Sequence, residues 1–231
     1  MIGATNLAGA MREDIPFAAE RRAMIEAQLR RRGLRDERVL EAMYAVPRHE
    51  FVPPASVHAA YDDCPLPLAD GQTISQPYIV AAMTYAVRVQ LGDKALEVGT
   101  GSGYQAAILA ALGARVYTLE RNPRLAAEAR ARLARLGYAG VEVIDGDGSE
   151  GYPPAAPYQV IMVTAAAPEV PEALLAQLAD GGRLVIPVGS LYHQDLQLIL
   201  KHGNETATRY LDACQFVPLI GKRGWPEKDA W

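Results

Sequence analysis

A glycine-rich turn with the sequence Glu-Val-Gly-Thr-Gly-Ser-Gly-Tyr occupies residues 97–104, between an apolar run and a helical stretch. Glycines at such a turn allow positive φ angles and a close approach of backbone to ligand, and the following helix offers unpaired N–H groups. The corner is therefore suited to a nucleotide-like cofactor. Because Gly101, Gly103 and Ala106 also satisfy a dinucleotide fingerprint, the glycines alone do not choose the cofactor.

Two glutamates at the ends of expected strands bear on the choice of cofactor, and one of them favours S-adenosylmethionine. Glu97 stands beside the glycines, where a carboxylate suits a cationic sulfonium and amino group and would oppose a pyrophosphate. Glu120 ends the next expected strand, where an acidic side chain can accept hydrogen bonds from both ribose hydroxyls. The second position serves either cofactor, so the preference for S-adenosylmethionine depends on Glu97.

A third strand end carries the sequence Asp-Gly-Asp-Gly over residues 145–148. Its carboxylates should lie on the same edge of the sheet as the two glutamates, and Asp147 could accept a hydrogen bond from an adenine amino group. A plain turn explains the segment equally well, because Asp-Gly is a common turn dipeptide. Both interpretations stay open at this position.

Several further segments of the chain form an ordered set with the glycine turn. The block Gly-Gln-Thr-Ile-Ser-Gln-Pro occupies residues 71–77, and the set also includes residues 97–104, 146–148, 163–168, 182–189 and 216–219. With these segments the chain resembles, in order from about residue 24 to residue 221, the protein-L-isoaspartate O-methyltransferases of bacterial type. The glycine motif is shared by many methyltransferases, whereas the block at residues 71–77 is specific to this family.

This resemblance implies transfer of a methyl group from S-adenosylmethionine to the α-carboxylate of L-isoaspartyl residues in damaged proteins and peptides. By position, Ser75 is the catalytic residue. The residues implied at the cofactor are Gln72, Thr73, Ile74, Ser75, Glu97, Gly99, Thr100, Gly101, Ser102, Gly103, Glu120, Arg121, Asp147 and Gly148. Those implied at the substrate are Thr73, Ser75, Val217 and Pro218.

The implied reaction needs few catalytic groups. A carboxylate is already ionised near neutral pH and the sulfonium is an activated donor, so no general base is required. We therefore expect Ser75 to orient the acceptor by a hydrogen bond rather than to act as a covalent nucleophile. The alternatives are a carboxyl or hydroxyl methyltransferase for a biosynthetic peptide or small molecule, a non-catalytic cofactor-binding module, and an oxidoreductase.

The elements that would position these residues alternate between strand and helix after residue 77. Apolar periodicity predicts helices over residues 17–29, from the Asp36 cap onward, and over 80–87, 106–112, 122–136 and 168–178. Strands are expected over residues 95–98, 115–119, 141–144, 159–163, 183–188, 196–200 and 210–217. This rhythm predicts an α/β, doubly wound, Rossmann-like sheet, mostly parallel, with helices on both faces and an N-terminal helical segment.

We expect one methyltransferase domain over residues 1–231. Residues 16–77 would supply N-terminal helices and an irregular substrate and active-site loop, and residues 78–221 the cofactor-binding sheet. The first fifteen residues are expected to be disordered. The tail, residues 222–231, matches no segment of the family and is expected to take no part in the chemistry.

Net charge and the counts of cysteine and histidine limit the classes of partner and metal that we expect. With 23 basic and 27 acidic side chains the net charge is −4, which gives no global attraction to nucleic acid or to an anionic membrane. Two cysteines and four scattered histidines have no metal-ligand spacing, and two cysteines are too few for a disulfide scaffold. We therefore expect a cytoplasmic protein without a metal. The resemblance implies isoaspartyl-containing proteins and peptides as its partners, and we expect the protein to be a monomer.

Overall fold

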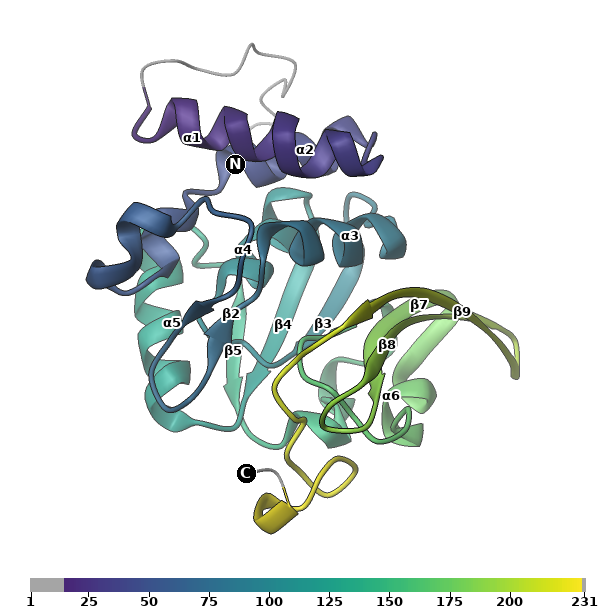
Figure 1. Ribbon diagram of the computed structural model, residues 1–231. Coiled ribbons are helices and arrows are strands. Elements are labelled where there is room, and N and C mark those ends of the chain that lie inside the picture. The colour runs from purple at the N-terminus through teal and green to yellow at the C-terminus, as the bar shows by residue number, and fades with distance from the viewer. Residues whose placement is uncertain (1–14, 230–231) are drawn as a thin grey trace.

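A computed structural model describes residues 15–229 of the chain, and Figure 1 shows its arrangement. Helices near the N-terminus cover the helical layer of a twisted sheet, and the C-terminal segment returns toward the edge of the sheet where strands β3 and β4 end. The disorder expected for the first fifteen residues falls, apart from Ile15, outside the described residues.

The N-terminal layer begins with α1 (Ala18–Ala23), which continues through a π-helical turn (Met24–Leu29) and a 3-10 turn (Arg30–Arg32). Its apolar face is buried, as the predicted helix over residues 17–29 requires. Helix α2 (Glu37–Ala45) follows, and the Asp36 side chain accepts hydrogen bonds from the first-turn N–H groups, as expected of an N-cap.

Residues 47–76 contain short elements only. They comprise two 3-10 helices, Arg48–Phe51 and Pro54–Ala59, and a small antiparallel pair formed by β1 (Leu66–Pro67) and β2 (Thr73–Ile74). The prolines that predicted an irregular segment also explain these brief helices, since proline suits the first turn of a helix but removes a backbone donor farther in.

A seven-stranded sheet of order β5-β4-β3-β6-β7-β8-β9 forms the centre of the molecule. Its first five strands in this order are parallel, and β8 and β9 continue it antiparallel. The doubly wound, mostly parallel fold is therefore confirmed. The strands are β3 (Lys94–Val98), β4 (Arg115–Glu120), β5 (Glu142–Asp145), β6 (Tyr158–Val163), β7 (Leu178–Gly189), β8 (Gln194–His202) and β9 (Glu205–Cys214).

Apolar residues on both faces of the sheet are buried against helices. Three of these helices, α3 (Pro77–Val87), α4 (Tyr104–Ala111) and α5 (Pro123–Arg135), contribute to one core, and α6 (Glu172–Gln177) contributes to the other. Neighbouring strand residues alternate between these cores, as in β3, where Ala95 belongs to the first and Leu96 to the second. The central strands therefore read as continuous apolar runs, as buried parallel strands do.

Several boundaries in the C-terminal half differ from the predictions. Helix α6 is shorter than the predicted helix over residues 168–178, and strand β7 already begins at Leu178. Strand β7 then passes through Gly181. At this position the positive φ of 70° belongs to an irregularity in the pairing with β6 rather than to a helix end.

The last predicted strand, over residues 210–217, ends instead at Cys214. Beyond it, the backbone of Phe216 forms hydrogen bonds with the side chain of Gln194 instead of with a neighbouring strand. Gln194 Oε1 accepts from the Phe216 N–H at 2.7 Å, and Gln194 Nε2 donates to the Phe216 carbonyl at 3.2 Å. The following residues are therefore free to turn toward the sheet centre, where Pro218 pairs with Ala166.

Candidate active site

The glycine corner joins β3 to α4 at the point where strand order reverses, because β4 lies on one side of β3 and β6 on the other. Ligands bind at such switch points, outside the carboxyl ends of the strands. The N–H groups of Gly99 and Thr100 both donate to the Leu119 carbonyl of β4, at 2.9 and 3.1 Å. Gly99 has a φ of 96°, and a Cβ there would lie 2.5 Å from Thr164 Oγ1. The corner thus requires glycine at this position.

Glu97 is fully buried at the end of β3 and lines a cavity together with Ser75 and Thr100. Its Oε2 accepts a 2.5 Å hydrogen bond from Thr118 Oγ1, but Oε1 has no partner among the described residues. Burial raises the pKa of Glu97 to about 8, and the nearby charge of Glu120 adds to that rise. An orphaned, buried carboxylate oxygen at a cavity indicates a missing donor, such as a cationic ligand group.

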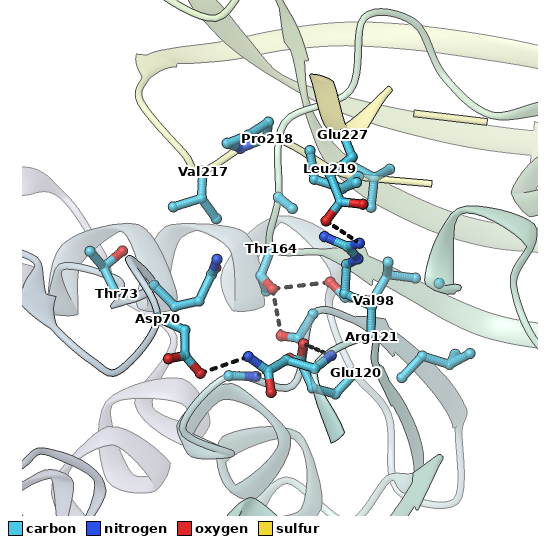
Figure 2. Close-up of a pocket in the computed structure, with 18 residues that line it drawn as sticks. Asp70, Thr73, Val98, Glu120, Arg121, Thr164, Val217, Pro218, Leu219 and Glu227 are labelled. Atoms are coloured by element: carbon cyan, nitrogen blue, oxygen red, sulfur yellow. Dashed lines mark hydrogen bonds and ion pairs between the residues drawn. The ribbon is translucent and has the colours of Figure 1, made fainter. Parts of the chain in front are cut away.

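Glu120 ends β4 and lines the adjoining cavity shown in Figure 2. Its two carboxylate oxygens accept from the backbone of the two neighbouring loops, Oε2 from Gly101 N at 2.9 Å and Oε1 from Asn122 N at 3.0 Å. Each oxygen keeps further acceptor capacity. The carboxylate therefore ties the glycine corner to the next loop and still faces the cavity in which the sequence predicted a ribose.

Asp147, which the resemblance implies at the cofactor, lies outside the lining of the cavity. Its carboxylate accepts from Ser149 N at 2.9 Å, from Ser149 Oγ at 2.7 Å and from Lys222 N at 2.8 Å, and the residue does not line the cavity. Gly148 does line it, and a Cβ there would lie 2.5 Å from Val98 Cγ1. The capping and turn role, which the sequence left open for Asp147, is the one its contacts support, and Gly148 forms the cavity wall.

Ser75 and its neighbours reach the site from the other side. Thr73 lines three adjoining cavities, and Ser75 lines two of them, the one beside Glu97 and one beside Cys214. No hydrogen bond from the Ser75 hydroxyl to another described residue is present, so the hydroxyl can donate to a ligand. The predicted residues that line at least one of these cavities are Gln72, Thr73, Ile74, Ser75, Glu97, Gly99, Thr100, Gly101, Ser102, Glu120, Arg121, Gly148, Val217 and Pro218. Gly103 and Asp147 do not.

Thr164 was not predicted as a site residue, yet it lines all three cavities and lies centrally in Figure 2. Its hydroxyl lies 3.0 Å from the Val98 carbonyl oxygen and 2.7 Å from that of Gly99, and thereby joins the end of β6 to the glycine corner. Its position directly after an apolar strand was the available signal, because polar residues at carboxyl strand ends face the ligand edge.

The tail also reaches the site, which corrects the expectation that it takes no part. Glu227 lines the same cavity as Glu120 and forms an ion pair with Arg121 at 3.2 Å (Figure 2). Trp225 anchors the tail, because its Nε1 donates to the Ala166 carbonyl at 3.1 Å and its backbone N to Leu219 at 2.7 Å. No family motif covers these residues, so resemblance could not have identified them.

Two further properties of residues 15–229 concern metals and membranes. The His, Cys, Asp and Glu side chains in this range include no group of three or more that could hold a metal ion. None of the helices in the same range is long and apolar enough to cross a membrane.

Comparison with known proteins gives consistent matches over most of the chain. Residues 19–224 match the family model described as protein-L-isoaspartate(D-aspartate) O-methyltransferase. The protein-L-isoaspartate O-methyltransferase of Koribacter versatilis is 56% identical over 209 residues, 90% of this chain and 94% of that protein. The enzyme of the same name from Methanoculleus marisnigri is 54% identical over 210 residues, 91% and 96% of the two chains.

Solved structures agree. One protein-L-isoaspartate O-methyltransferase superposes with a TM-score of 0.79 at 30% identity, over 88% of this chain and 67% of that one. A putative protein-L-isoaspartate O-methyltransferase from Plasmodium falciparum, in complex with S-adenosyl-L-homocysteine, has a TM-score of 0.76 at 27% identity, over 87% of this chain and 98% of that one.

Proposed function

This chain belongs to the protein-L-isoaspartate(D-aspartate) O-methyltransferase family. We propose that the residues lining its three adjoining cavities catalyse the repair reaction of that family. The chain is then an S-adenosylmethionine-dependent enzyme that methylates the α-carboxylate of L-isoaspartyl residues. The observation that carries the proposal is the placement of Ser75, whose unpaired hydroxyl lines the cavity of the orphaned Glu97 oxygen and also the cavity bordered by Val217.

The residues around the glycine corner fit S-adenosylmethionine. Glu97 Oε1 has no partner among the described residues, and burial favours the neutral form of Glu97, so a cationic ligand group beside it would stabilise the ionised form. Glycine at positions 99 and 148 leaves the room that a Cβ would fill. We propose that Glu97 faces the amino-acid part of the cofactor, Glu120 the ribose and Gly148 the adenine.

When bound, S-adenosylmethionine supplies a methyl group on a cationic sulfur, which passes to a carboxylate oxygen while the electron pair of the broken C–S bond stays on sulfur. The protein therefore has to hold and align two reactants rather than move a proton. Ser75 would donate one hydrogen bond that points the acceptor carboxylate toward the methyl group. Thr73 and Val217, which line the same cavity as Ser75, would border the acceptor peptide.

The state of the cysteines supports the cytoplasmic location that we propose. Cys64 and Cys214 are unpaired, which suits the reducing cytoplasm. Isoaspartyl proteins and peptides would be the partners, entering through the cavity that Pro65, Gln76 and Phe216 border. We propose that the protein works there as a monomer.

Transfer of labelled methyl from S-adenosylmethionine to an isoaspartyl peptide tests the function directly. We expect methylation of that peptide and none of the matching aspartyl peptide. We also expect S-adenosylhomocysteine to raise the thermal midpoint, because a ligand that binds only the native state stabilises it, and NAD to leave it unchanged. Equal labelling of the two peptides would contradict the acceptor, and an equal shift with NAD would contradict the cofactor.

The role of Ser75 has its own test. Ser75→Ala should lower kcat in single-turnover methylation by up to about 100-fold, because one oriented hydrogen bond is lost and methyl transfer neutralises charge instead of creating it. Cofactor affinity and stability should stay near those of the unchanged protein. Ser56→Ala is the control, since Ser56 lies in the same irregular segment without lining a cavity. Complete loss of transfer would indicate a more direct role, and an unchanged rate would remove any catalytic role.

A further inference from the structure

Arg48 is the largest fully buried side chain of the protein's described part, with an exposed fraction of 0%. It begins the 3-10 helix after Pro47, and its guanidinium lies over the Tyr104 ring, 4.9 Å from the ring centroid. Two of its nitrogens donate to backbone carbonyls of separate segments. Nε donates to Ala60 at 2.7 Å, and Nη2 donates to Ser75 at 2.8 Å.

Burial of the Arg48 guanidinium is energetically unfavourable. Arg48 forms no ion pair with a described residue, its Nη1 has no partner, and burial lowers its pKa. Removing an unpaired cation from water costs several kcal/mol, and an apolar side chain of similar size would avoid that cost. The stacking on Tyr104 and the two carbonyl contacts offset it only in part. What distinguishes Arg48 from an apolar residue is the forked pair of donors.

The Arg48 guanidinium contacts Ser75, the residue whose hydroxyl we propose donates to the acceptor carboxylate. Ser75 is flanked by Ile74, which is buried, and by Gln76, whose Nε2 donates to Asp63 Oδ1 at 2.7 Å. Arg48 holds the carbonyl between these two anchors. With both neighbours and its own carbonyl fixed, the Cα–Cβ bond of Ser75 has one direction, and this limits the hydroxyl to the few positions that the staggered χ1 rotamers reach.

We propose that Arg48 is a positioning residue for methyl transfer, which acts by fixing the Ser75 main chain so that the hydroxyl meets the acceptor carboxylate. This inference rests on the role proposed for Ser75. It assigns a kinetic function to a side chain that lines none of the three cavities, and it predicts that the effect of Arg48 disappears when the Ser75 hydroxyl is absent.

Arg21 provides a matched control. It is also buried, with an exposed fraction of 3%, and it also donates to two backbone carbonyls, those of Tyr44 at 2.8 Å and Ala45 at 3.2 Å. It has one orphaned donor as well, Nε. Its acceptors belong to α2, away from the cavities. A loss that reflects only a damaged N-terminal layer should therefore appear with Arg21 as it does with Arg48.

The experiment is a double-mutant cycle on the full chain. Arg48→Lys keeps a cation but cannot reach both carbonyls, and it should lower single-turnover kcat about 10-fold or more, because a small misplacement near the reacting groups is costly. Affinity for S-adenosylhomocysteine should change less than about twofold. In the Ser75→Ala background, Arg48→Lys should cause almost no further loss, since coupled residues are not additive. Arg21→Lys should leave kcat unchanged at a temperature where it is folded.

Any of three results would overturn the inference. The first is an equal loss of kcat from Arg48→Lys with and without the Ser75 hydroxyl. The others are an unchanged kcat in Arg48→Lys and a loss of kcat in Arg21→Lys as large as that in Arg48→Lys. If Arg48→Lys does not fold, Arg48→Gln gives the same comparison, because the neutral amide is easier to bury and retains one donor group. Failure of the unchanged protein to methylate an isoaspartyl peptide would remove the proposed function as well, and that result is seen before any variant is made.

Discussion

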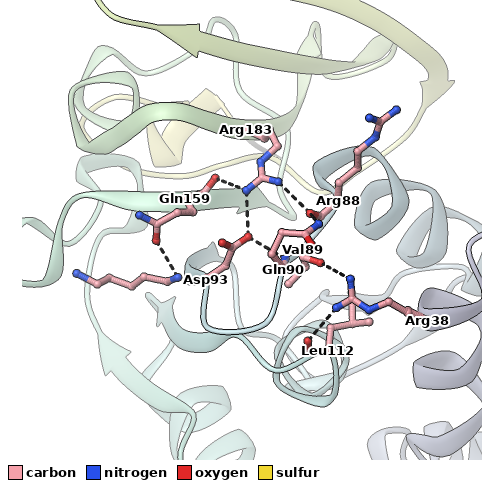
Figure 3. A network of polar contacts seen from close by, with 9 residues as sticks. Arg38, Arg88, Val89, Gln90, Asp93, Leu112, Gln159 and Arg183 are labelled. Atoms are coloured by element: carbon pink, nitrogen blue, oxygen red, sulfur yellow. Dashed lines mark hydrogen bonds and ion pairs between the residues drawn. The ribbon is translucent and has the colours of Figure 1, made fainter. Parts of the chain in front are cut away.

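The two ends of the sheet use polar groups in opposite ways. At the amino end, around the start of β3, charges pair with each other (Figure 3). Arg183 Nη2 donates to Asp93 Oδ2 at 3.0 Å, and Nη1 donates to the Arg88 carbonyl at 2.9 Å. Arg38 donates to the carbonyls of Val89 and Leu112 and links the N-terminal layer to the same end.

At the carboxyl end, Glu97 and Glu120 lie close enough for one charge to raise the pKa of the other, and no described cation pairs with either. A sheet end that stabilises the fold satisfies its own charges, whereas one that binds a cationic ligand leaves charges of one sign unsatisfied. The difference predicts that variants at the carboxyl end change ligand binding and that variants at the amino end change stability alone.

The largest effect on binding should come from Gly99→Ala. The new Cβ would lie 2.5 Å from Thr164 Oγ1 on a backbone with φ of 96°, so strain and crowding act together. The corner would relax away from its binding geometry, and restoring that geometry on binding at a cost of about 3 kcal/mol corresponds to roughly 100-fold weaker binding of S-adenosylhomocysteine by calorimetry. Gly140→Ala is the control, because the position is exposed with no heavy atom within 4 Å. Equal affinities in the two variants would contradict the tight fit at the corner.

Glu120→Gln should have the next largest effect. Replacing a charged acceptor of Gly101 N, Asn122 N and the expected ribose hydroxyls should weaken cofactor binding roughly tenfold, as loss of a hydrogen bond to a charged group does. At saturating cofactor, kcat should be nearly unchanged, since this contact is the same in ground and transition states. Glu128→Gln, an exposed residue of α5, is the control. A lower kcat with unchanged affinity would argue against a ribose contact.

A smaller effect is expected at Glu97, where ligand binding should change the number of protons that the protein binds. Its pKa in the folded protein is about 8, against an ordinary value of 4.5, so the native state binds more protons between these pH values. The contribution of Glu97 to stability is therefore present below pH 4.5 and is lost as pH rises toward 8.

A ligand ammonium group next to Glu97 should lower this pKa, so binding of S-adenosylhomocysteine through its amino group near pH 7 should release up to about one proton. Calorimetry in buffers of different ionisation enthalpy measures the number. Glu97→Gln should release fewer protons, and its stability should not decline across that pH range as the unchanged protein's does. Equal proton release by both proteins would show that Glu97 does not meet the ligand's charge.

The smallest effect on binding should come from Asp93→Asn at the amino end. Arg183 would lose its only described ionic partner in a contact that is mostly buried, which should cost about 1–3 kcal/mol of the free energy of unfolding. Affinity for S-adenosylhomocysteine and kcat should stay within about twofold of the unchanged protein. Denaturant unfolding and the methylation assay measure the two quantities, and a parallel loss of affinity would mean that the two ends are coupled.

Much of the fold could be predicted because local pattern and global structure agree in the parallel half. The apolar runs that became β3, β4 and β6 and the glycine corner between β3 and α4 were found within a residue or two. Alternating strands and helices allow few topologies, so the ligand edge followed from the order of elements alone.

What the sequence did not predict depends on contacts between distant segments. Gln194 ends the last strand at Cys214 by bonding Phe216, and the tail brings Glu227 to Arg121. In the sequence, Arg48 is one more charged residue near a proline, and its contact with the Ser75 carbonyl appears only in the folded structure. No local propensity encodes these pairings, because each requires the fold to exist first.

The residues that line the cavity of Glu120 run in sequence from Asp70 to Glu227. A ribosome makes the glycine corner before it makes residues 217–227. A nascent chain that ends before residue 217 therefore carries the glycine corner without one wall of the cavity. The stabilisation that a bound cofactor gives the native state should become available only after these last residues are made.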